Sequence, residues 1–191
     1  MEIIVTPDPR LRLVSKKVSK ITDETKKHIN LMIKNSLEWE AEHPFELSAA
    51  MAAPQLGINE RIIIIRDNME DKDDQAFVAL INPEVIKTDG KIIKDYEGCL
   101  SVPKFYGLIP RPNKVRIKAK TIDGTEVRIK AEGSLARTLL HEIDHLDGVL
   151  FIDHIKDQPD AWFELDDKGE ITPVDYLARV KNNPDLFPDE A

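Results

Sequence analysis

The chain has a single cysteine among its 191 residues, which excludes an internal disulfide bond. Cys99 is therefore a buried thiol, a nucleophile or a metal ligand. Long apolar runs are also missing. No purely aliphatic run is longer than the four residues Ile62–Ile65, whereas a helix that crosses a bilayer needs about 20 apolar residues. We therefore expect a protein without a membrane anchor in a reducing cytoplasm.

Positive charge is in short supply as well. Acidic residues outnumber Lys and Arg by 35 to 27, which leaves a net charge of −8 and argues against binding of nucleic acid through the whole surface. No direct nucleic-acid site is evident in the sequence. The amino-terminal residues 1–10 combine acidic residues with prolines, which is unlike a secretory signal.

Length and composition fit one globular domain over residues 1–191. Neither an internal repeat nor a linker composition divides the chain. Helical and strand-like segments are interspersed, so we predict the α+β class, with mixed or antiparallel strands packed around a central helix. The pattern weakens after about residue 156, and we treat residues 157–191 as a C-terminal extension.

Local patterns predict several elements of this fold. Thr22 can cap a helix that should end near His43, because Pro44 disfavours a helical residue before it. Asp123-Gly124 is typical of a tight turn between two strands. Pro83 should end the strand that precedes it. The segments with strand-like patterns are residues 61–66, 76–82, 114–120 and 126–131.

The most informative stretch is His141-Glu142-Ile143-Asp144-His145. On a helix with about 3.6 residues per turn, the two histidines lie on one face, where both rings can bind one metal ion. Glu142 then lies beside the site without being forced to ligate the metal, which suits a general base. Apolar residues along the same helix indicate a buried face, where unpaired imidazole rings would be costly. The predicted central helix is therefore a metal-binding helix.

Two histidines seldom hold a catalytic metal alone, so we expect a third ligand and one position open for water. Phe151 stands where the long protease motif requires a third histidine, which disfavours that group. Glu164 has nearly the spacing of another group of zinc proteases, and a metalloprotease that uses it is the alternative function. Cys99 follows Gly98, which lets the backbone approach closely, and its thiolate would be a strong ligand.

Three motifs in this order resemble the signature motifs of peptide deformylase. They are Ala52-Ala53-Pro54-Gln55, Glu97-Gly98-Cys99-Leu100-Ser101 and His141-Glu142-Ile143-Asp144-His145. The likeness covers roughly residues 5–155 and also includes Pro110-Arg111. The joint occurrence of the motifs is far more specific than the two histidines and the glutamate alone.

The resemblance implies a metal centre. Cys99, His141 and His145 would bind one divalent metal ion, and Glu142 would take a proton from water and deliver it to the leaving amine. Fe(II) is the metal that the resemblance implies in the cell, while a site with two nitrogen ligands and one sulfur ligand also suits Zn(II), Ni(II) or Co(II).

The resemblance also implies a substrate and a reaction. The N–H of Leu100 and the side-chain amide of Gln55 would stabilise the oxyanion during removal of the formyl group from N-formyl-methionyl nascent peptides, which releases formate. Residues around Ala49, Ala50 and Gly98 would bind the peptide as an extended strand. Substrates of this kind imply a transient ribosome contact.

The chain departs from the family pattern at Ser48 and Ala50, where glycine is usual. A β-carbon at Ala50 is expected to affect substrate fit, which leaves a deformylase-like protein with reduced or altered activity as a further alternative. Outside the motifs, we expect Glu97 to pair with Arg111 and support the metal ligands.

Overall fold

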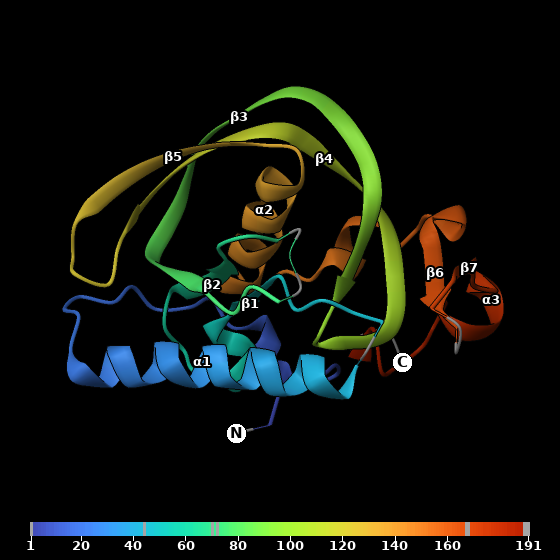
Figure 1. Cartoon of the computed structure of the whole chain (residues 1–191). Coiled ribbons are helices and arrows are strands. Elements are labelled where there is room, and N and C mark those ends of the chain that lie inside the picture. Colours follow the sequence, from blue (N-terminus) through green and yellow to red (C-terminus); the bar gives the residue numbers. More distant parts are fainter. Residues whose placement is uncertain (1, 44, 70, 72, 167–168, 189–191) are drawn as a thin grey trace.

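The structure is a computed structural model that describes residues 2–43, 45–69, 71, 73–166 and 169–188 (Figure 1). Helices and strands follow one another as α1 (Asp23–Glu42), β1 (Ala50–Ala52), β2 (Ile62–Arg66), β3 (Phe77–Cys99), β4 (Val102–Lys120), β5 (Glu126–Glu132), α2 (Ser134–Leu146), β6 (Trp162–Leu165), β7 (Ile171–Pro173) and α3 (Tyr176–Arg179). Short 3-10 turns lie between several of them.

The strands form one antiparallel sheet in the order β1-β2-β3-β4-β6-β7, and β5 also pairs with β4. Strand β4 is long enough for both neighbours, because β6 pairs near its start and β5 near its end. Figure 1 shows β3 and β4 as a long bent ribbon that arches over α2, while α1 runs below β1 and β2. The α+β class with a central helix is confirmed.

The isoleucine run of β2 lies between two apolar clusters, one on the side of α2 and one on the side of α1. Successive side chains of a strand point to opposite faces, and every residue of β2 is buried. Ile63 and Ile65 pack in the apolar cluster that contains the α2 residue Leu139, whereas Ile62 and Ile64 pack in the cluster of α1. The uninterrupted run is therefore explained by a strand covered on both faces.

The expected helix and hairpin are present. Helix α1 begins after Thr22, whose side chain accepts the N–H of Thr25 at 3.3 Å, and it ends before His43. Strands β4 and β5 form the predicted hairpin, with Lys120 opposite Glu126 at its closed end. Helix α2 begins after Gly133 and ends at Leu146.

The prediction that Pro83 ends its strand was wrong. Strand β3 continues to Cys99 after a register shift between Ile81 and Glu84. Asn82 adopts a positive φ of 53° there, and its side chain exchanges hydrogen bonds of 2.8 Å with the backbone of Val18. The bulge places Pro83 where the sheet does not need its missing N–H. The continuation matters because it brings Cys99 beside the histidines of α2.

The last part of the chain packs on the outer side of this arch. Trp162 is 1% exposed and lies in an apolar cluster with Phe151, Val180 and Phe187. The C-terminal extension therefore adds strands to the sheet and shares a core with residues that precede it. Among the described residues, no helix is both long enough and apolar enough to cross a membrane.

Candidate metal centre

Cys99, His141 and His145 come together although they lie on different elements. Cys99 is the last residue of β3, and both histidines project from α2. One ligand atom from each residue lies within 4.8 Å of the others. The Sγ atom of Cys99 is 3.1 Å from Nε2 of His145, and the two imidazole rings are 5.0 Å apart at their centres. This is a donor set that can hold one divalent ion.

Glu97 fixes the orientation of the first histidine. Its Oε2 atom is 2.9 Å from Nδ1 of His141, which leaves the Nε2 atom of that ring for the cluster. Arg111 donates two hydrogen bonds to the same carboxylate, at 2.6 and 2.9 Å, and Arg137 donates a third at 2.7 Å. Burial opposes a charge on Glu97, but His141 and Arg111 hold its pKa well below the usual range. The geometry agrees with the expected pairing of Glu97 and Arg111.

The charges around the histidines fit a cation. Burial opposes a proton on His141, but hydrogen bonds with Cys99 and Glu97 hold the pKa of its ring well above its ordinary value. Burial and the neighbouring His141 lower the pKa of His145, which favours the neutral ring that a metal requires. The negative groups Cys99 and Glu97, which raise the pKa of His141, would also attract a divalent cation.

Glu142 is the buried acid beside this cluster. It is 4% exposed, and within the described part of the chain its Oε2 atom has no hydrogen-bond partner. Burial raises the pKa of Glu142 to about 7. A carboxyl group of this kind can accept and release a proton near neutral pH. Its unpartnered oxygen is the kind of atom that a water molecule or a substrate would satisfy.

Gln55 and Leu100 lie around the cysteine. The Nε2 atom of Gln55 donates to Sγ of Cys99 at 3.6 Å and to the hydroxyl oxygen of Ser101 at 3.2 Å. Its Oε1 atom accepts the N–H of Ala52 at 2.8 Å, which fixes the direction of the amide. Leu100 follows Cys99 directly and lines the same pocket.

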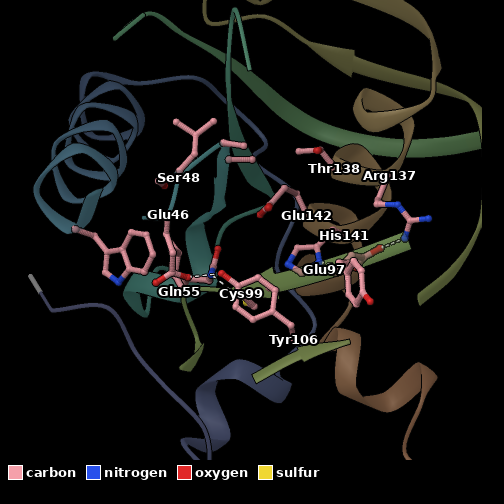
Figure 2. Close-up of a pocket in the computed structure, with 17 residues that line it drawn as sticks. Glu46, Ser48, Gln55, Glu97, Cys99, Tyr106, Arg137, Thr138, His141 and Glu142 are labelled. Carbon is pink, nitrogen blue, oxygen red and sulfur yellow. Dashed lines mark hydrogen bonds and ion pairs between the residues drawn. The ribbon is translucent and has the colours of Figure 1, made fainter. Parts of the chain in front are cut away.

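A pocket of about 260 Å³ opens over these residues (Figure 2). The predicted substrate-binding residues Ala49, Ala50 and Gly98 are in its wall. Strand β1 is at the end of the sheet order and pairs with β2 alone among the described strands, so its other edge can accept an extended peptide. Gly98 allows close packing, because a β-carbon there would lie 2.6 Å from the ring of Tyr106.

Several residues that line the pocket were not predicted from the sequence. Arg137 lies four residues before His141 on α2, and this spacing could have indicated a shared face. Tyr96 is next to Glu97 in the chain. Glu46 and Tyr106 had no such signal, because they are 60 residues apart and meet only through the fold.

The two other candidate ligand positions have different roles. Glu164 lies on β6, where its carboxylate accepts a hydrogen bond from Arg179, and it is outside the metal-ligand group found among the described residues. Phe151 is buried, and its ring is stacked 6.3 Å from that of His141. Phe151 therefore packs beside the histidine pair.

Comparison with known proteins decides the family. The polypeptide deformylase profile matches residues 1–160. The chain belongs to the peptide deformylase family. A peptide deformylase from Halothermothrix orenii is 44% identical over 148 residues, which cover 78% of this chain and 88% of that protein. One from Thermomicrobium roseum is 38% identical over 171 residues, which cover 88% and 93%.

Solved deformylase structures share the fold. The peptide deformylase from Synechococcus elongatus in complex with actinonin has a TM-score of 0.71 and 35% identity, and the match covers 83% of this chain and 80% of that one. The plant peptide deformylase PDF1B has a TM-score of 0.73 and 31% identity, with coverage of 83% and 82%. Members of the family are enzymes, and the resemblance stated from the motifs is confirmed.

Proposed function

We propose that this chain removes the formyl group from the amino terminus of N-formyl-methionyl peptides by metal-dependent hydrolysis and releases formate. The observation that carries the proposal is the convergence of Cys99, His141 and His145 beside the buried Glu142 on the wall of one pocket. Family membership supports the same reaction.

Each part of the reaction has a residue suited to it. A divalent ion held by Cys99, His141 and His145 would supply Lewis acidity toward the formyl carbonyl and make a water molecule easier to deprotonate. Glu142 accepts the proton of the attacking water and then transfers it to the nitrogen of the leaving amine. Burial suits it to both steps, because a carboxyl group with a pKa of about 7 exists in both forms at neutral pH.

The remaining site residues bind and orient the substrate. The backbone N–H of Leu100 and the Nε2–H of Gln55 donate hydrogen bonds to the oxygen on which negative charge develops. The peptide lies as an extended strand between the edge residues Ala49 and Ala50 on one side and Gly98 on the other. Backbone hydrogen bonds of this kind tolerate many downstream sequences, which suits nascent peptides as substrates.

The metal is proposed from chemistry. Two imidazole ligands and one thiolate suit Fe(II), Zn(II), Co(II) and Ni(II), and we propose Fe(II) as the metal in the cell. Protein loaded with each metal under anaerobic conditions should differ in turnover, and the metal content of freshly isolated protein identifies the resident ion.

The deciding experiment measures formate release from formyl-Met-Ala-Ser by the metal-loaded protein and by Glu142→Gln. Turnover should fall by about a hundredfold or more in the variant, because proton transfer by a placed side chain contributes about 10² to 10⁴ to the rate. Metal content should stay at one ion per chain. Full activity in Glu142→Gln would contradict the assigned role. Cleavage of unformylated peptides that needs Glu164 and not Cys99 would replace the proposal with a metalloprotease.

A further inference from the structure

The β4–β5 hairpin carries positive charge on its outer face. Along β4, Val115, Ile117 and Ala119 are buried in the apolar cluster that contains α2 residues, so the alternate side chains point away from α2. The facing side chains of β5 are exposed in the same way. With their neighbours on β3 and before α1, the cations of this basic face are Lys17, Lys87, Lys114, Arg116, Lys118, Lys120, Arg128 and Lys130.

Acidic side chains balance only part of this charge. The four acids that lie among the eight cations are Glu84, Asp89, Glu126 and Glu132. The basic face therefore has a surplus of four positive charges, in a chain whose net charge is −8. Hydrogen bonds from Lys118 and Lys17 lower the pKa of Glu84 to about 2, which reflects the positive surroundings of that acid. Charge that is segregated in this way attracts anions to one side of a protein.

Strand pairing places like charges opposite each other in the middle of the hairpin. Arg116 is the register partner of Lys130, and Lys118 is the register partner of Arg128. Like charges directly opposite each other on two strands destabilise the sheet. The four cations therefore reduce the stability of the hairpin that carries them.

The two ends of the hairpin have the opposite arrangement. Lys114 faces Glu132, with 3.0 Å between Nζ and Oε2, and Lys120 faces Glu126. Opposite charges in facing positions stabilise a pair of strands. The fold thus accepts acids on this face of β5, and stability alone does not explain the cations in the middle. An anionic partner would explain them.

The cations in the middle are exposed to such a partner. Arg116, Arg128 and Lys130 are exposed, and they take part in no ion pair within the described residues. The face is also hollowed by two cavities of about 470 and 240 Å³, each lined by four of the cations and two of the acids. Concave surfaces with an excess of one charge concentrate the electric field.

The arrangement of the charges favours a polymer of phosphates. The outward cations of residues 114–120 recur at every second position, about 7 Å apart, over a length of about 20 Å. Along a double helix each strand presents a phosphate about every 3.4 Å, so several phosphates would lie opposite this row.

Two other anionic partners fit the face less well. The outward positions of residues 114–120 and 126–132 are all charged, so a single strand would find no aromatic ring there on which its bases could stack. The same positions lack the apolar side chains that insert into a lipid surface. The backbone of a double helix requires neither.

We propose that the basic face of the β4–β5 hairpin binds the phosphate backbone of double-helical RNA. RNA is chosen over DNA because nascent peptides emerge from the ribosome, and this choice alone rests on the proposed function. The net charge of the whole chain argues against nucleic acid on the whole surface, whereas this contact is confined to one face.

The test measures fluorescence anisotropy of a labelled RNA duplex of about 20 base pairs, without substrate. Affinity should fall as salt rises, with a slope of about −3 to −4 on logarithmic axes, because about four phosphates are neutralised. The double variant Arg128→Glu, Lys130→Glu should bind about tenfold more weakly or worse at low salt, and its slope should lose about two of these contacts.

A stability measurement shows that this loss does not come from unfolding. The double variant replaces two like-charge pairs with opposite-charge pairs, so its midpoint in urea should lie above that of the wild type. Formate release from formyl-Met-Ala-Ser should stay unchanged, because neither residue lines the metal-site pocket.

A matched control separates the face from the net charge. Lys34→Glu, Lys181→Glu makes the same change in charge at exposed positions outside the basic face, and it should keep RNA affinity close to that of the wild type. Equal weakening in the two double variants would overturn the proposal, because binding would then follow net charge alone.

The remaining outcomes also decide the matter. A wild-type protein that binds no RNA duplex at low salt, or that prefers phosphatidylserine vesicles or a DNA duplex, would overturn the inference and leave the deformylase function standing. RNA binding by a protein that hydrolyses no formyl peptide with any metal would refute the proposed function and leave the basic face as a nucleic-acid surface.

Discussion

The Oε2 atom of Glu97 lies 2.9 Å from Nδ1 of His141, and the same carboxylate is gripped by Arg111 through two hydrogen bonds. Arg111 continues to Asp144 at 2.7 Å on α2. These hydrogen bonds therefore connect β3, which carries Cys99, to α2, which carries the histidines, through residues that contact the ligands without being ligands themselves. Outer partners of this kind fix the tautomer and direction of a ligating imidazole.

This relationship predicts a loss of metal affinity in Arg111→Ala. The change leaves Glu97 with less support and frees the orientation of His141, so metal affinity should fall by about 10- to 100-fold. Competition with a chelator of known affinity measures the effect. Arg116→Ala removes an exposed arginine from the same strand and should bind metal like the wild type. Equal affinities in the two variants would contradict the supporting role of Arg111.

A second prediction concerns Ala50, one of the two positions where the resemblance to the deformylase motif led us to expect glycine. Neither Ser48 nor Ala50 has a positive φ, so the backbone does not require glycine at these positions. The β-carbon of Ala50 instead occupies space in the wall of the pocket. Ala50→Gly should lower KM for formyl-Met-Ala-Ser by less than tenfold while kcat changes little, because only the fit of the bound peptide is altered.

The same substitution has a cost in stability. Glycine in a strand should reduce the free energy of unfolding by about 0.5–1 kcal/mol relative to alanine, which chemical denaturation measures. Ala52→Gly, on the same strand but in the core, should lose stability without a change in KM. An unchanged KM in Ala50→Gly would mean that the β-carbon does not limit substrate fit.

The sequence could predict the residues that carry local signals. His141 and His145 lie on one helix at a fixed spacing, and Cys99 lies among flanking residues of a recognisable motif. The prediction failed where a distant contact decides the local structure. Strand β3 continues beyond Pro83 because Asn82 bonds to the backbone of Val18, 64 residues away in the chain.

Some residues of the pocket wall could not be predicted from the sequence for the same reason. No periodicity relates Glu46 to Tyr106, and their contact depends on the arch of β3 and β4 returning over the loop before β1. When two residues lie on the same helix, as Arg137 and His141 do, their spacing in the sequence can predict that they share a site. When they lie on different elements, as Glu46 and Tyr106 do, only the folded structure shows that they are in contact.

A third prediction concerns Phe163, in the C-terminal extension, which lies after the residues 1–160 that match the family profile. Phe163 on β6 packs edge-on against Tyr96 at 4.9 Å between ring centres and is the register partner of Tyr106. Both tyrosines line the pocket. Phe163→Ala should raise KM severalfold and leave kcat nearly unchanged, because the ring supports the pocket wall without touching the metal ligands.

Two comparisons identify this effect as positioning. Phe163→Tyr keeps an aromatic ring and should restore a KM close to that of the wild type. Ile171→Ala removes an apolar side chain from β7 that is 38% exposed, and it should leave KM unchanged. If Phe163→Ala lowers kcat and kcat/KM equally, the residue affects the reacting centre and the proposed route through Tyr96 is wrong.

The fourth prediction concerns the buried ion pair that holds β1 in place. Arg66 is fully buried, and its guanidinium donates to the carboxylate of Glu40 on α1 and to the carbonyl of Ser48. The N–H of Arg66 also donates to the carbonyl of Ala49 at 2.8 Å. The pair therefore ties α1 to the chain segment that forms one wall of the pocket.

Glu40→Ala should lower the free energy of unfolding by about 3–5 kcal/mol, because it removes the carboxylate with which Glu40 pairs the buried charge of Arg66. Urea denaturation monitored by circular dichroism measures the loss.

The double variant Glu40→Met, Arg66→Met removes both charges and should lose less stability than Glu40→Ala alone. A double variant that is less stable would mean that the bonds from Arg66 to the backbone, at Ser48 and elsewhere, outweigh the ion pair. The KM for deformylation gives a second readout of the role of Arg66. It should rise in the double variant, because the carbonyl of Ser48 in the pocket wall loses its donor.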